Sequence, residues 1–591
     1  MKIFLVFDSP SFPSKILEKD CRRVEIFSLT ANWDDINHVV NKLKSIDIES
    51  NLLNSAAMID SEVSLYKDSF IEWAGAIGNL KINGKSIRQR LLLSDKNISA
   101  WWFGLLADKD PFKSSAFLRI AQTEAILKGF KQSKSDIIAL ALKDYDLQKK
   151  MKLIFEDYGI KCQCIKVRTR DDGLSKEIKK HLKRQRLIKS LYTLGKIFIN
   201  VMYLKIIMPS LKKRKMTFND ALIAFTYFPS VIKEDALIGK FRNRFAIPLQ
   251  DICNQNKKTI VWILAYGGYD GYSFKDAVKL AKKFIENGEN IFFYLEFLDV
   301  KSLLKAFLEY LYIVLTWRRV RSKLNHNDMN IITGNSYVTK FILETLDDSF
   351  YGSNSLMGII QYEAFKNMGK NITGFSHGLY FCEMQVWEYA LVAAMRFNKI
   401  TFPLIGYQHS SIPINQLSYF HSREELKDKN TSDGIPMQEV LACNGSVPQS
   451  IMKRYYDKVE NLEALRYLYL NEYLRKEKII KSENKFILMV CTGIEFEESI
   501  MIVNLIKAAY PKTDDKMKIW FKGHPAFPVQ IYLRAVGIAG NDKTYEVKEG
   551  DISTLLSQSN AVLTVSSTIA IEALVFDCDV LTYVNSVTID K

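Results

Sequence analysis

The sequence is poor in side chains that bind metals. Its 591 residues include only seven histidines and eight cysteines, and the histidines are scattered along the chain. Only Cys162 and Cys164 are closely spaced, and no second pair lies near them. Structural zinc sites are typically built from two such pairs at fixed spacing. The sequence therefore disfavours a metal enzyme and predicts no metal ligands, and we expect the cysteines to be reduced, mostly buried thiols of a cytoplasmic protein.

The chain shows no secretion signal at its N-terminus, and it has no internal repeat or low-complexity tract. "MKIFLVFDSPSF" carries one lysine and a short apolar run that ends at Asp8. A signal peptide needs a longer apolar region and a cleavage site of small residues. We therefore interpret this segment as a first β-strand and expect a cytoplasmic location.

Acidic residues are fewer than basic ones, 66 against 82, which gives a net charge of +16. The length predicts about three domains, and 48% hydrophobic residues predict a globular chain. The positive charge favours a negative partner, either nucleic acid, anionic lipid or a phosphorylated substrate. The basic runs are confined to a connector and to "WRRVRSK", without a recognisable nucleic-acid-reading module. Nucleic-acid binding thus stays an alternative, and we expect no nucleic-acid partner.

One segment raises the question of a membrane. "LYTLGKIFINVMYLKIIMP", residues 191–209, is about the length of a membrane-spanning helix and has basic residues on both sides. Lys196 and Lys205 lie inside it, and each would cost roughly 2.5 to 3.5 kcal/mol near the centre of a bilayer. Helical geometry puts them on opposite faces, so the segment is not cleanly amphipathic. We expect a buried or interfacial helix that suits an anionic membrane surface, with an ordinary helix in a solvated linker as the alternative.

Apolar strands alternate with helices through most of the chain, which predicts the α/β class. The first block, 1–168, is an N-terminal α/β domain, and 169–215 is the basic connector with its apolar helix. The second block, 216–440, contains the β-α-β pattern "KTIVWILAY", "FKDAVKLAKKFIENG" and "NIFFYLEFL". The third block is 441–591. We expect the last two blocks to be Rossmann-like domains.

In the third block, polar residues follow the apolar strands directly. "KFILMVCTG" ends at Gly493, "KMKIWFKGHP" reaches His524, and "AVLTV" is followed by Ser566 and Ser567. Continuously apolar strands predict a parallel sheet covered on both faces. The carboxyl ends of such strands line one crevice, where ligands bind. We therefore expect these four residues to meet along one edge.

The chemistry expected at that edge is the binding of a nucleotide. Ser566, Ser567 and Thr568 lie where a strand turns into a helix, so backbone N–H groups and hydroxyls face the crevice as an anion site. His524 can donate a hydrogen bond to a phosphate oxygen, and Glu572 can accept from a ribose diol. Each residue also has a plainer interpretation: a serine before a helix is usually a cap, and a glutamate in a first helical turn is usually a surface residue.

The motifs "KGHP" and "SSTIAIEAL" resemble the nucleotide-sugar domain of bacterial GT-B glycosyltransferases that carry His-Pro and Ser-Ser motifs. That group includes sialyl-, polysialyl- and octulosonic acid transferases. The resemblance implies two Rossmann-like domains in a GT-B arrangement behind the N-terminal domain, and a CMP-sugar as donor in preference to a UDP-sugar. It implies that His524, Ser566 and Ser567 contact the nucleotide and that Glu572 binds the ribose.

Three upstream segments, "FCEMQVWEYALVAAMRF", "PLIGYQHSSIP" and "EVLACNG", are similar to bacterial surface-carbohydrate biosynthesis proteins. The order is that of a GT-B enzyme, with the acceptor side first, a hinge near 440 and the donor side last. Two features depart from the pattern. The acidic Asp-Gly or Glu-Gly dyad that sialyltransferases use as a base is missing, and the chain stops at "VNSVTIDK" without the usual closing helices, as expected of a truncated C-terminus.

Sugar transfer needs a base to take the proton of the acceptor hydroxyl. His409 is the favoured candidate, because histidine titrates near neutral pH and "GYQHSS" is expected to face the cleft between the domains. Glu383 and Glu388, beside a tryptophan, are the other candidates. A loop histidine that only bonds the backbone is an equally good interpretation.

The sequence thus predicts a metal-independent glycosyltransferase that needs no cofactor beyond its nucleotide-sugar substrate. The expected acceptor is a bacterial surface polysaccharide or a lipid-linked glycan precursor, in capsule, lipopolysaccharide or O-antigen synthesis, reached from the cytoplasm or from the inner membrane surface. A non-enzymatic phosphate- or nucleotide-binding protein of polysaccharide assembly is the second interpretation, and a basic nucleic-acid-binding protein is the third.

Overall fold

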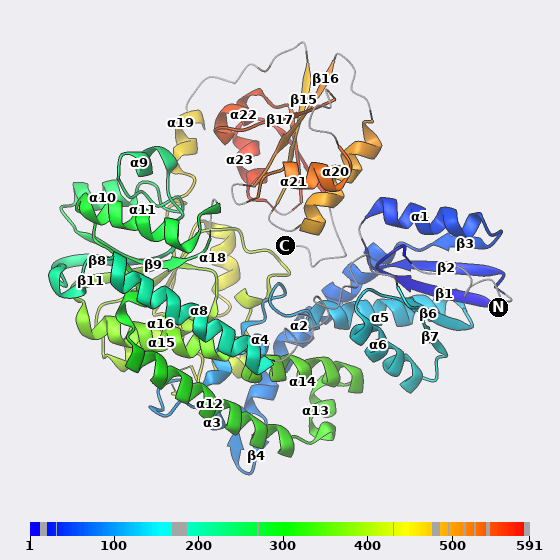
Figure 1. Cartoon of the computed structure of the whole chain (residues 1–591), viewed down its shortest axis with the longest axis horizontal. Helices are drawn as coiled ribbons and strands as arrows, with labels where there is room; N and C mark the ends of the chain where they lie inside the picture. The colour runs from blue at the N-terminus through cyan, green and yellow to red at the C-terminus, as the bar shows by residue number, and fades with distance from the viewer. Residues whose placement is uncertain are drawn as a thin grey trace.

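The strands expected from the sequence form three parallel sheets in a computed structural model of the chain (Figure 1). The first sheet lies at the right of the view, the second at the left and the third at the top. The structure describes residues 1–11, 21–30, 32–167, 186–268, 271–429, 431–474, 481, 485–493, 496–511, 516–524, 527–538, 544–565 and 567–583.

The first sheet has the strand order β3-β2-β1-β6-β7 and is parallel throughout. Its central strand, β1, buries Phe4 and Val6 on one face and Leu5 and Phe7 on the other. The strand is apolar at every position because helices cover both faces of the sheet. The strands and their covering helices are β1 (Lys2–Phe7), β2 (Arg23–Ser28), β3 (Glu49–Leu52), β6 (Ile137–Ala141), β7 (Cys162–Cys164), α1 (Trp33–Lys44), α5 (Ala116–Ser133) and α6 (Tyr145–Asp157).

The second sheet has seven parallel strands in the order β10-β9-β8-β11-β12-β13-β14. The last two strands lie beyond residue 439, so this sheet continues past the boundary expected near 440 and takes in chain as far as Asn461. Its strands are β8 (Thr217–Phe228), β9 (Ile260–Tyr266), β10 (Ile291–Phe293), β11 (Thr373–Cys382), β12 (Leu404–Gln408), β13 (Val440–Cys443) and β14 (Val459–Asn461).

The third sheet has the order β17-β16-β15-β18-β19, again all parallel. The chain leaves β15 toward one side of the sheet and returns through β18 on the other, so the strand order reverses between these two neighbours. Ligands of open α/β sheets bind at such a point. The elements are β15 (Phe486–Cys491), β16 (Met517–Lys522), β17 (Tyr545–Val547), β18 (Ala561–Thr564), β19 (Asp579–Thr582), α20 (Phe496–Ala509), α21 (Gln530–Ala535), α22 (Ile552–Gln558) and α23 (Ile569–Val575).

A layer of helices between β10 and β11 joins the first sheet to the second. One continuous apolar core runs through both, and Trp101 from the first unit packs on Phe350 of this layer. Lys109 and Glu425, both fully buried, form an ion pair of 2.6 Å across the same junction. The third sheet instead packs its own two clusters, one on each face. The helices of this layer are α12 (Val300–Lys323), α13 (His326–Thr333), α14 (Ser336–Tyr351) and α15 (Ser353–Asn371), and α2 (Ser55–Asn79) of the first unit packs on α13.

The apolar helix of the basic connector is α8 (Arg186–Ile207), which packs on α11 (Phe274–Glu286), α14 and α15. The part of the connector at 168–185 lies outside the described residues. Among the described residues, 186–213 is the one helical segment long and apolar enough to cross a membrane. Its most apolar stretch of 18 residues has a mean hydropathy of 1.4, and 22% of that stretch is buried in the protein. Only the length and composition of α8 support a membrane span. Because one side of α8 packs on the protein, we favour a helix that lies along the surface.

The predicted α/β class is confirmed, with Rossmann-like parallel sheets in the second and third units and an additional α/β sheet at the N-terminus. The helical layer 300–371 was not expected as a separate feature. Two of its helices, α14 and α15, are buried on several sides, so their sequence has no single amphipathic period that identifies them.

Candidate functional site

The carboxyl edge of the third sheet carries the residues expected to bind a nucleotide. Gly493 follows β15, His524 follows β16 and Ser567 follows β18. Because the three strands are parallel, these residues lie at the same edge of the sheet, as predicted. Ser566 lies outside the described residues.

Two buried hydroxyls mark the same edge. Thr564 ends β18 and Thr492 follows the neighbouring strand β15 directly, and within the described part of the chain neither Oγ1 has a hydrogen-bond partner. A buried polar group without a partner costs stability and is often found where a ligand binds. Both groups lie next to the point where the strand order reverses.

The start of α23 is partly occupied by its own cap. The Ser567 Oγ accepts a hydrogen bond from the Ile569 backbone N–H at 3.3 Å, so this serine acts as a helix cap, as its plainer interpretation held. Thr568, at the N-cap position, makes no such bond with its side chain. Its Oγ1 instead lies 3.3 Å from a guanidinium nitrogen of Arg466, which donates to it.

Glu572 is nearly buried and already has a partner. The Tyr469 hydroxyl donates to its Oε2 at 2.8 Å, and burial raises the pKa of the carboxyl. Tyr469 lies in the segment that connects the second sheet to the third. Glu572 therefore helps to dock that segment on α23 in this structure, and a role in binding ribose stays a prediction.

Arg466 is the functional candidate that the sequence did not reveal. Its backbone is held to the second sheet, because the Tyr407 hydroxyl of β12 donates to the Glu463 carbonyl at 3.0 Å and accepts from the Leu465 N–H at 2.9 Å. Its side chain reaches Thr568 on the third sheet. "LEALRYLYL" carries no motif, so only the path of the chain between the two sheets indicates this arginine.

The three expected base candidates come together at the carboxyl edge of the second sheet. Glu383 follows β11 and His409 follows β12, which are neighbouring parallel strands. The His409 Nε2 lies 3.5 Å from the Glu383 Oε1. Glu388 begins the next helix, α16 (Val386–Phe397), and accepts from the Glu383 backbone N–H at 2.8 Å.

The expectation that His409 titrates near neutral pH is wrong. The ring is only 2% exposed and packs between Phe245 and Phe381, with ring centroids 4.6 and 5.4 Å away. Burial, together with the nearby charge of Arg466, lowers its pKa to about 3. His409 is therefore neutral at physiological pH and is too weakly basic to be a good general base.

Glu388 is also unsuited to that role. It is fully buried, and its Oε1 accepts from the backbone N–H groups of Glu383 and Gln385 at 2.8 and 3.0 Å, which caps α16. Burial raises its pKa to about 8, so the group is mostly protonated at neutral pH. Glu383, by contrast, keeps 32% of its side chain exposed. It is the one candidate of the three that an acceptor hydroxyl can reach.

Two cavities adjoin this cluster. A cavity of about 520 Å³ lies between the units, lined by the ends of β12 and β13, by the segment around Arg466 and by Ile571 and Val575 of α23. A second cavity of about 330 Å³, here called the aromatic pocket, lies at the ends of β8 and β9 and at the start of α16. Its lining includes Tyr227, Tyr266, Tyr294, Phe365, Trp387 and Gln385.

Neither edge offers an obvious site for a metal. Within the described ranges, no group of three or more His, Cys, Asp or Glu side chains is placed to hold a metal ion. The polar groups that converge between the two sheets are an arginine, hydroxyls, a neutral histidine and one accessible carboxylate. This set suits a phosphate-bearing ligand beside a group that accepts a proton.

No protein-family model matches the chain, and no curated protein matches it. Solved structures that are similar in part include UDP-GlcNAc 2-epimerase from Neisseria meningitidis bound to UDP-GlcNAc, at 12% identity over 61% of this chain and 82% of that one, with a TM-score of 0.30. The apo lipopolysaccharide outer core galactosyltransferase WaaB has 11% identity over 61% and 80%, with a TM-score of 0.30. The N-terminal domain of trehalose-6-phosphate phosphatase from Candida albicans has 14% identity over 64% and 85%, with a TM-score of 0.32. At such scores these likenesses carry no argument about activity.

Proposed function

We propose that the protein is a glycosyltransferase that moves a sugar from a nucleotide-activated donor to a glycan acceptor. One observation carries the proposal: Arg466 donates to Thr568 at the start of α23 on the donor edge, and its charge acts on His409, which lies 3.5 Å from Glu383 on the acceptor edge. A cationic group between a nucleotide site and an accessible carboxylate is what transfer away from a phosphate requires.

The third sheet binds the donor nucleotide in this proposal, and the second sheet supplies the base. The nucleotide binds at Gly493, His524 and Ser567, with its sugar directed toward the second sheet. The Glu383 carboxylate takes the proton of the acceptor hydroxyl while that oxygen forms a bond to the anomeric carbon. The bond from that carbon to the donor phosphate breaks, and its electron pair leaves with the phosphate. Arg466 and the Thr568 hydroxyl stabilise the charge that develops there.

His409 is then a positioning residue rather than the base. Its neutral ring lies against Glu383 and is fixed by two phenylalanines. Arg466 is close enough for its charge to lower the pKa of His409, so the ring stays neutral and adds no second positive charge beside the carboxylate.

The aromatic pocket is where the acceptor sugar would bind. Its rings can pack on the apolar face of a sugar, and the Gln385 amide at its edge can hydrogen-bond hydroxyls. The pocket reaches residues 385–387, directly after Glu383 in the chain, so a bound acceptor lies near the proposed base. The motif resemblance favours a CMP-sugar donor and an acceptor from surface polysaccharide synthesis.

A thermal-shift screen with CMP, UDP, GDP and CDP-glycerol, followed by transfer assays with the matching nucleotide sugars, tests the proposal. We expect one nucleotide to raise the Tm and Arg466→Gln to lower transfer by roughly 10- to 1,000-fold. Arg466→Lys is the matched control, because it keeps the charge while losing the planar fork, and it should retain more activity.

The outcomes of this screen separate the three interpretations. Nucleotide binding without turnover of any donor would favour a non-enzymatic binding protein. Salt-sensitive retention on DNA without any response to nucleotides would favour a nucleic-acid-binding protein. The absence of any Tm shift would contradict the nucleotide site itself.

A further inference from the structure

The exposed side of α8 is apolar. Leu187, Leu191, Ile199 and Ile206 all point away from the protein, and Ile206 is 78% exposed. The buried side of the helix carries Ser190, Ile197, Val201 and Leu204. With 3.6 residues per turn, the exposed apolar side chains span an arc of about 140° from Leu187 to Tyr192. A helix of a soluble protein normally presents polar residues over such an arc.

The lysines of α8 border this arc instead of interrupting it. Lys205 lies five turns after Leu187, at one edge, and Lys189 and Lys196 lie beyond the other edge. From the sequence, the opposite positions of Lys196 and Lys205 predicted a helix that is not cleanly amphipathic. In the fold the two lysines flank one exposed apolar surface, because the buried side of α8 faces α14 and α15. From these positions long basic side chains can reach past an apolar surface toward water or phosphate.

α12 exposes a second apolar stripe. Leu304, Leu308, Leu311 and Leu315 recur at intervals of four, three and four residues, which places them on one face of the helix. This spacing normally identifies the face that packs in a core. Here the stripe faces outward, and Leu308 is 58% exposed.

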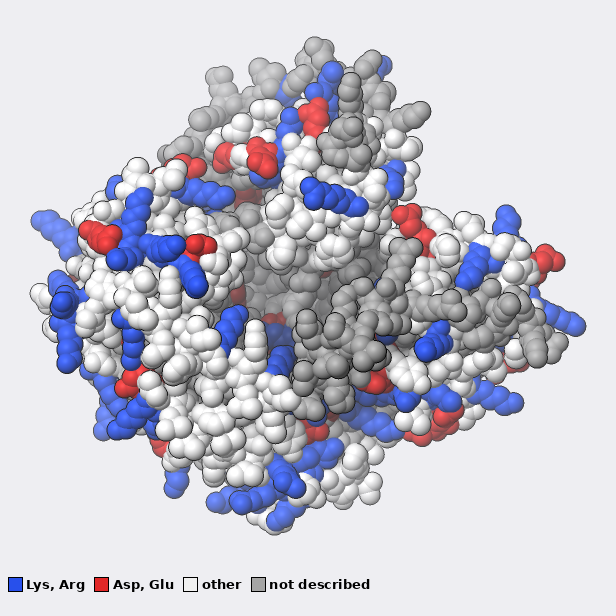
Figure 2. All heavy atoms as spheres, viewed as in Figure 1, with Lys and Arg blue, Asp and Glu red and all other residues white. Residues whose placement is uncertain are grey.

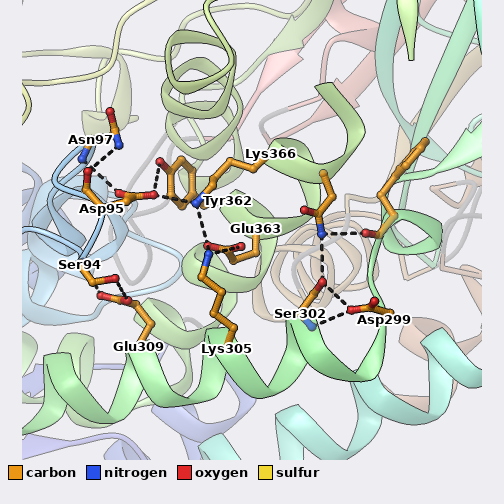
Figure 3. A network of polar contacts seen from close by, with 12 residues as sticks. Ser94, Asp95, Asn97, Asp299, Ser302, Lys305, Glu309, Tyr362, Glu363 and Lys366 are labelled. Carbon is orange, nitrogen blue, oxygen red and sulfur yellow. Dashed lines mark hydrogen bonds and ion pairs between the residues drawn. The ribbon is translucent and has the colours of Figure 1, made fainter. Parts of the chain in front are cut away.

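The buried side of α12 is apolar and carries Leu303, Ala306, Tyr310, Ile313, Trp317 and Val320. Polar contacts beside it tie the helix to its neighbours (Figure 3). Lys305 forms an ion pair of 2.9 Å with Glu363 of α15, and the Glu309 Oε1 accepts from the Ser94 backbone N–H at 2.8 Å. Lys366 continues the network to Asp95 at 2.7 Å. The buried apolar side and these contacts together fix the rotation of α12 about its axis, which leaves its leucines turned toward solvent.

The two helices form one surface. The Tyr310 hydroxyl of α12 donates to the Ser190 Oγ of α8 at 3.0 Å, and both helices pack on α14 and α15. Figure 2 shows an uncharged area over α8 and α12, with lysine and arginine side chains around it. We call this area, with its border of basic residues, the α8–α12 face. The basic residues of the two helices at its border are Lys189, Lys196, Lys205, Lys301, Arg318 and Arg319.

We propose that the α8–α12 face docks on the surface of an anionic lipid bilayer, with both helices lying in the plane of the membrane. The leucines and isoleucines enter the boundary between headgroups and acyl chains, and the basic border meets the lipid phosphates. A second copy of the chain fits this face less well, because two identical basic borders would repel each other. A membrane span would require α8 to leave its contacts with α11, α14 and α15.

The docking does not rest on the proposed function, because it needs neither donor nor acceptor. It does add to that function. Arg186 and Lys189, at the start of α8, line a cavity of about 600 Å³ that shares Lys113 and Asn354 with the aromatic pocket. A docked protein thus holds its acceptor side beside the membrane, which suits a lipid-linked acceptor.

Flotation of the full chain with vesicles tests the docking. The vesicles are made of phosphatidylcholine alone or of phosphatidylcholine with 30% phosphatidylglycerol. We expect binding to the anionic vesicles only, with a fall in affinity as salt rises, because exposed charges are screened over about 8 Å at physiological ionic strength. We expect the double variant Leu304→Gln, Leu311→Gln and the double variant Arg318→Gln, Arg319→Gln each to weaken binding at least tenfold.

Leu65→Gln with Leu153→Gln is the matched control, because these leucines are exposed on α2 and α6, away from the α8–α12 face. This variant should bind vesicles like the wild type, and an unchanged far-ultraviolet spectrum checks the fold of every variant. Equal binding by the control and by both test variants would place the contact elsewhere and overturn the proposal. So would a dimer in light scattering that only the leucine variant abolishes, without vesicle binding, or resistance to extraction by carbonate.

Discussion

The carboxyl edges of the second and third sheets are built alike and differ in burial. Both are the carboxyl ends of parallel strands, and both carry a histidine just after a strand, His409 and His524. His409 is enclosed by phenylalanines and has a pKa of about 3. His524 is partly exposed in a short turn, where its carbonyl accepts from the Phe527 N–H at 2.9 Å. The comparison shows that the enclosure of a residue, more than its type, decides which chemistry it can perform.

The same contrast separates the two glutamates of the second sheet. Glu388 is buried and bonded to backbone N–H groups, and Glu383, five residues earlier, is one-third exposed. Adjacent carboxyls with different environments commonly take different roles in one site. Here the buried one caps the start of α16, and the exposed one is accessible to an acceptor.

The largest effect expected from this contrast is on transfer. Glu383→Gln should lower kcat by roughly 100- to 10,000-fold, because the amide cannot accept the hydroxyl proton, while the affinity for nucleotide stays unchanged. His409→Ala should lower kcat less and should not shift the pH profile through neutrality, since its ring is neutral there. If Glu383→Gln had wild-type turnover, Glu383 would not be the general base, and His409 would again be the candidate. Calorimetry with nucleotide and initial-rate kinetics measure the two quantities.

The next effect concerns stability and pH. The pKa of Glu388 is raised to about 8 from 4.5, so folding favours its protonated form, and its contribution to stability is present below pH 4.5 and is lost as the pH rises toward 8. Glu388→Gln keeps a neutral side chain and should flatten this dependence, with a gain over the wild type of up to about 5 kcal/mol above pH 8. Urea unfolding at pH 5, 7 and 9 measures it. A wild-type stability that rises from pH 5 to 9, with the same slope in the variant, would contradict a buried neutral Glu388.

The smallest effects are expected at the donor edge. His524→Ala and Ser567→Ala should each weaken nucleotide binding by roughly 1.5 to 3 kcal/mol, because each loses one hydrogen bond to a charged phosphate. The Ser567 variant should also lower the free energy of unfolding by about 1 kcal/mol, since its hydroxyl caps α23. Calorimetry and urea unfolding separate these losses. Unchanged nucleotide affinity in both variants would mean that the serine is only a cap and the histidine only part of its turn.

Much of the third unit could be predicted from the sequence. The strands β15, β16, β18 and β19 are short, largely apolar runs that the pattern identifies, whereas the three-residue β17 was not predicted. The polar residues at the edge follow closely after their strands in the chain. Local order therefore places Gly493, His524 and Ser567 correctly once a parallel sheet is assumed. The second unit was harder to predict from the sequence, because β13 and β14 are short and the helices α14 and α15 are buried on several sides.

The sequence by itself determined the α/β class, the parallel third sheet and the set of residues at its edge, because these depend on patterns within a few residues of one another. Only the tertiary structure decided three further features. It buried His409 and Glu388 and left Glu383 accessible, since burial depends on aromatic side chains such as Phe245 that are distant in the chain. It brought Arg466 to Thr568 across two sheets. It also turned the leucines of α12 toward solvent, because the opposite side of that helix, with Ala306, Ile313 and Trp317, is buried against the protein.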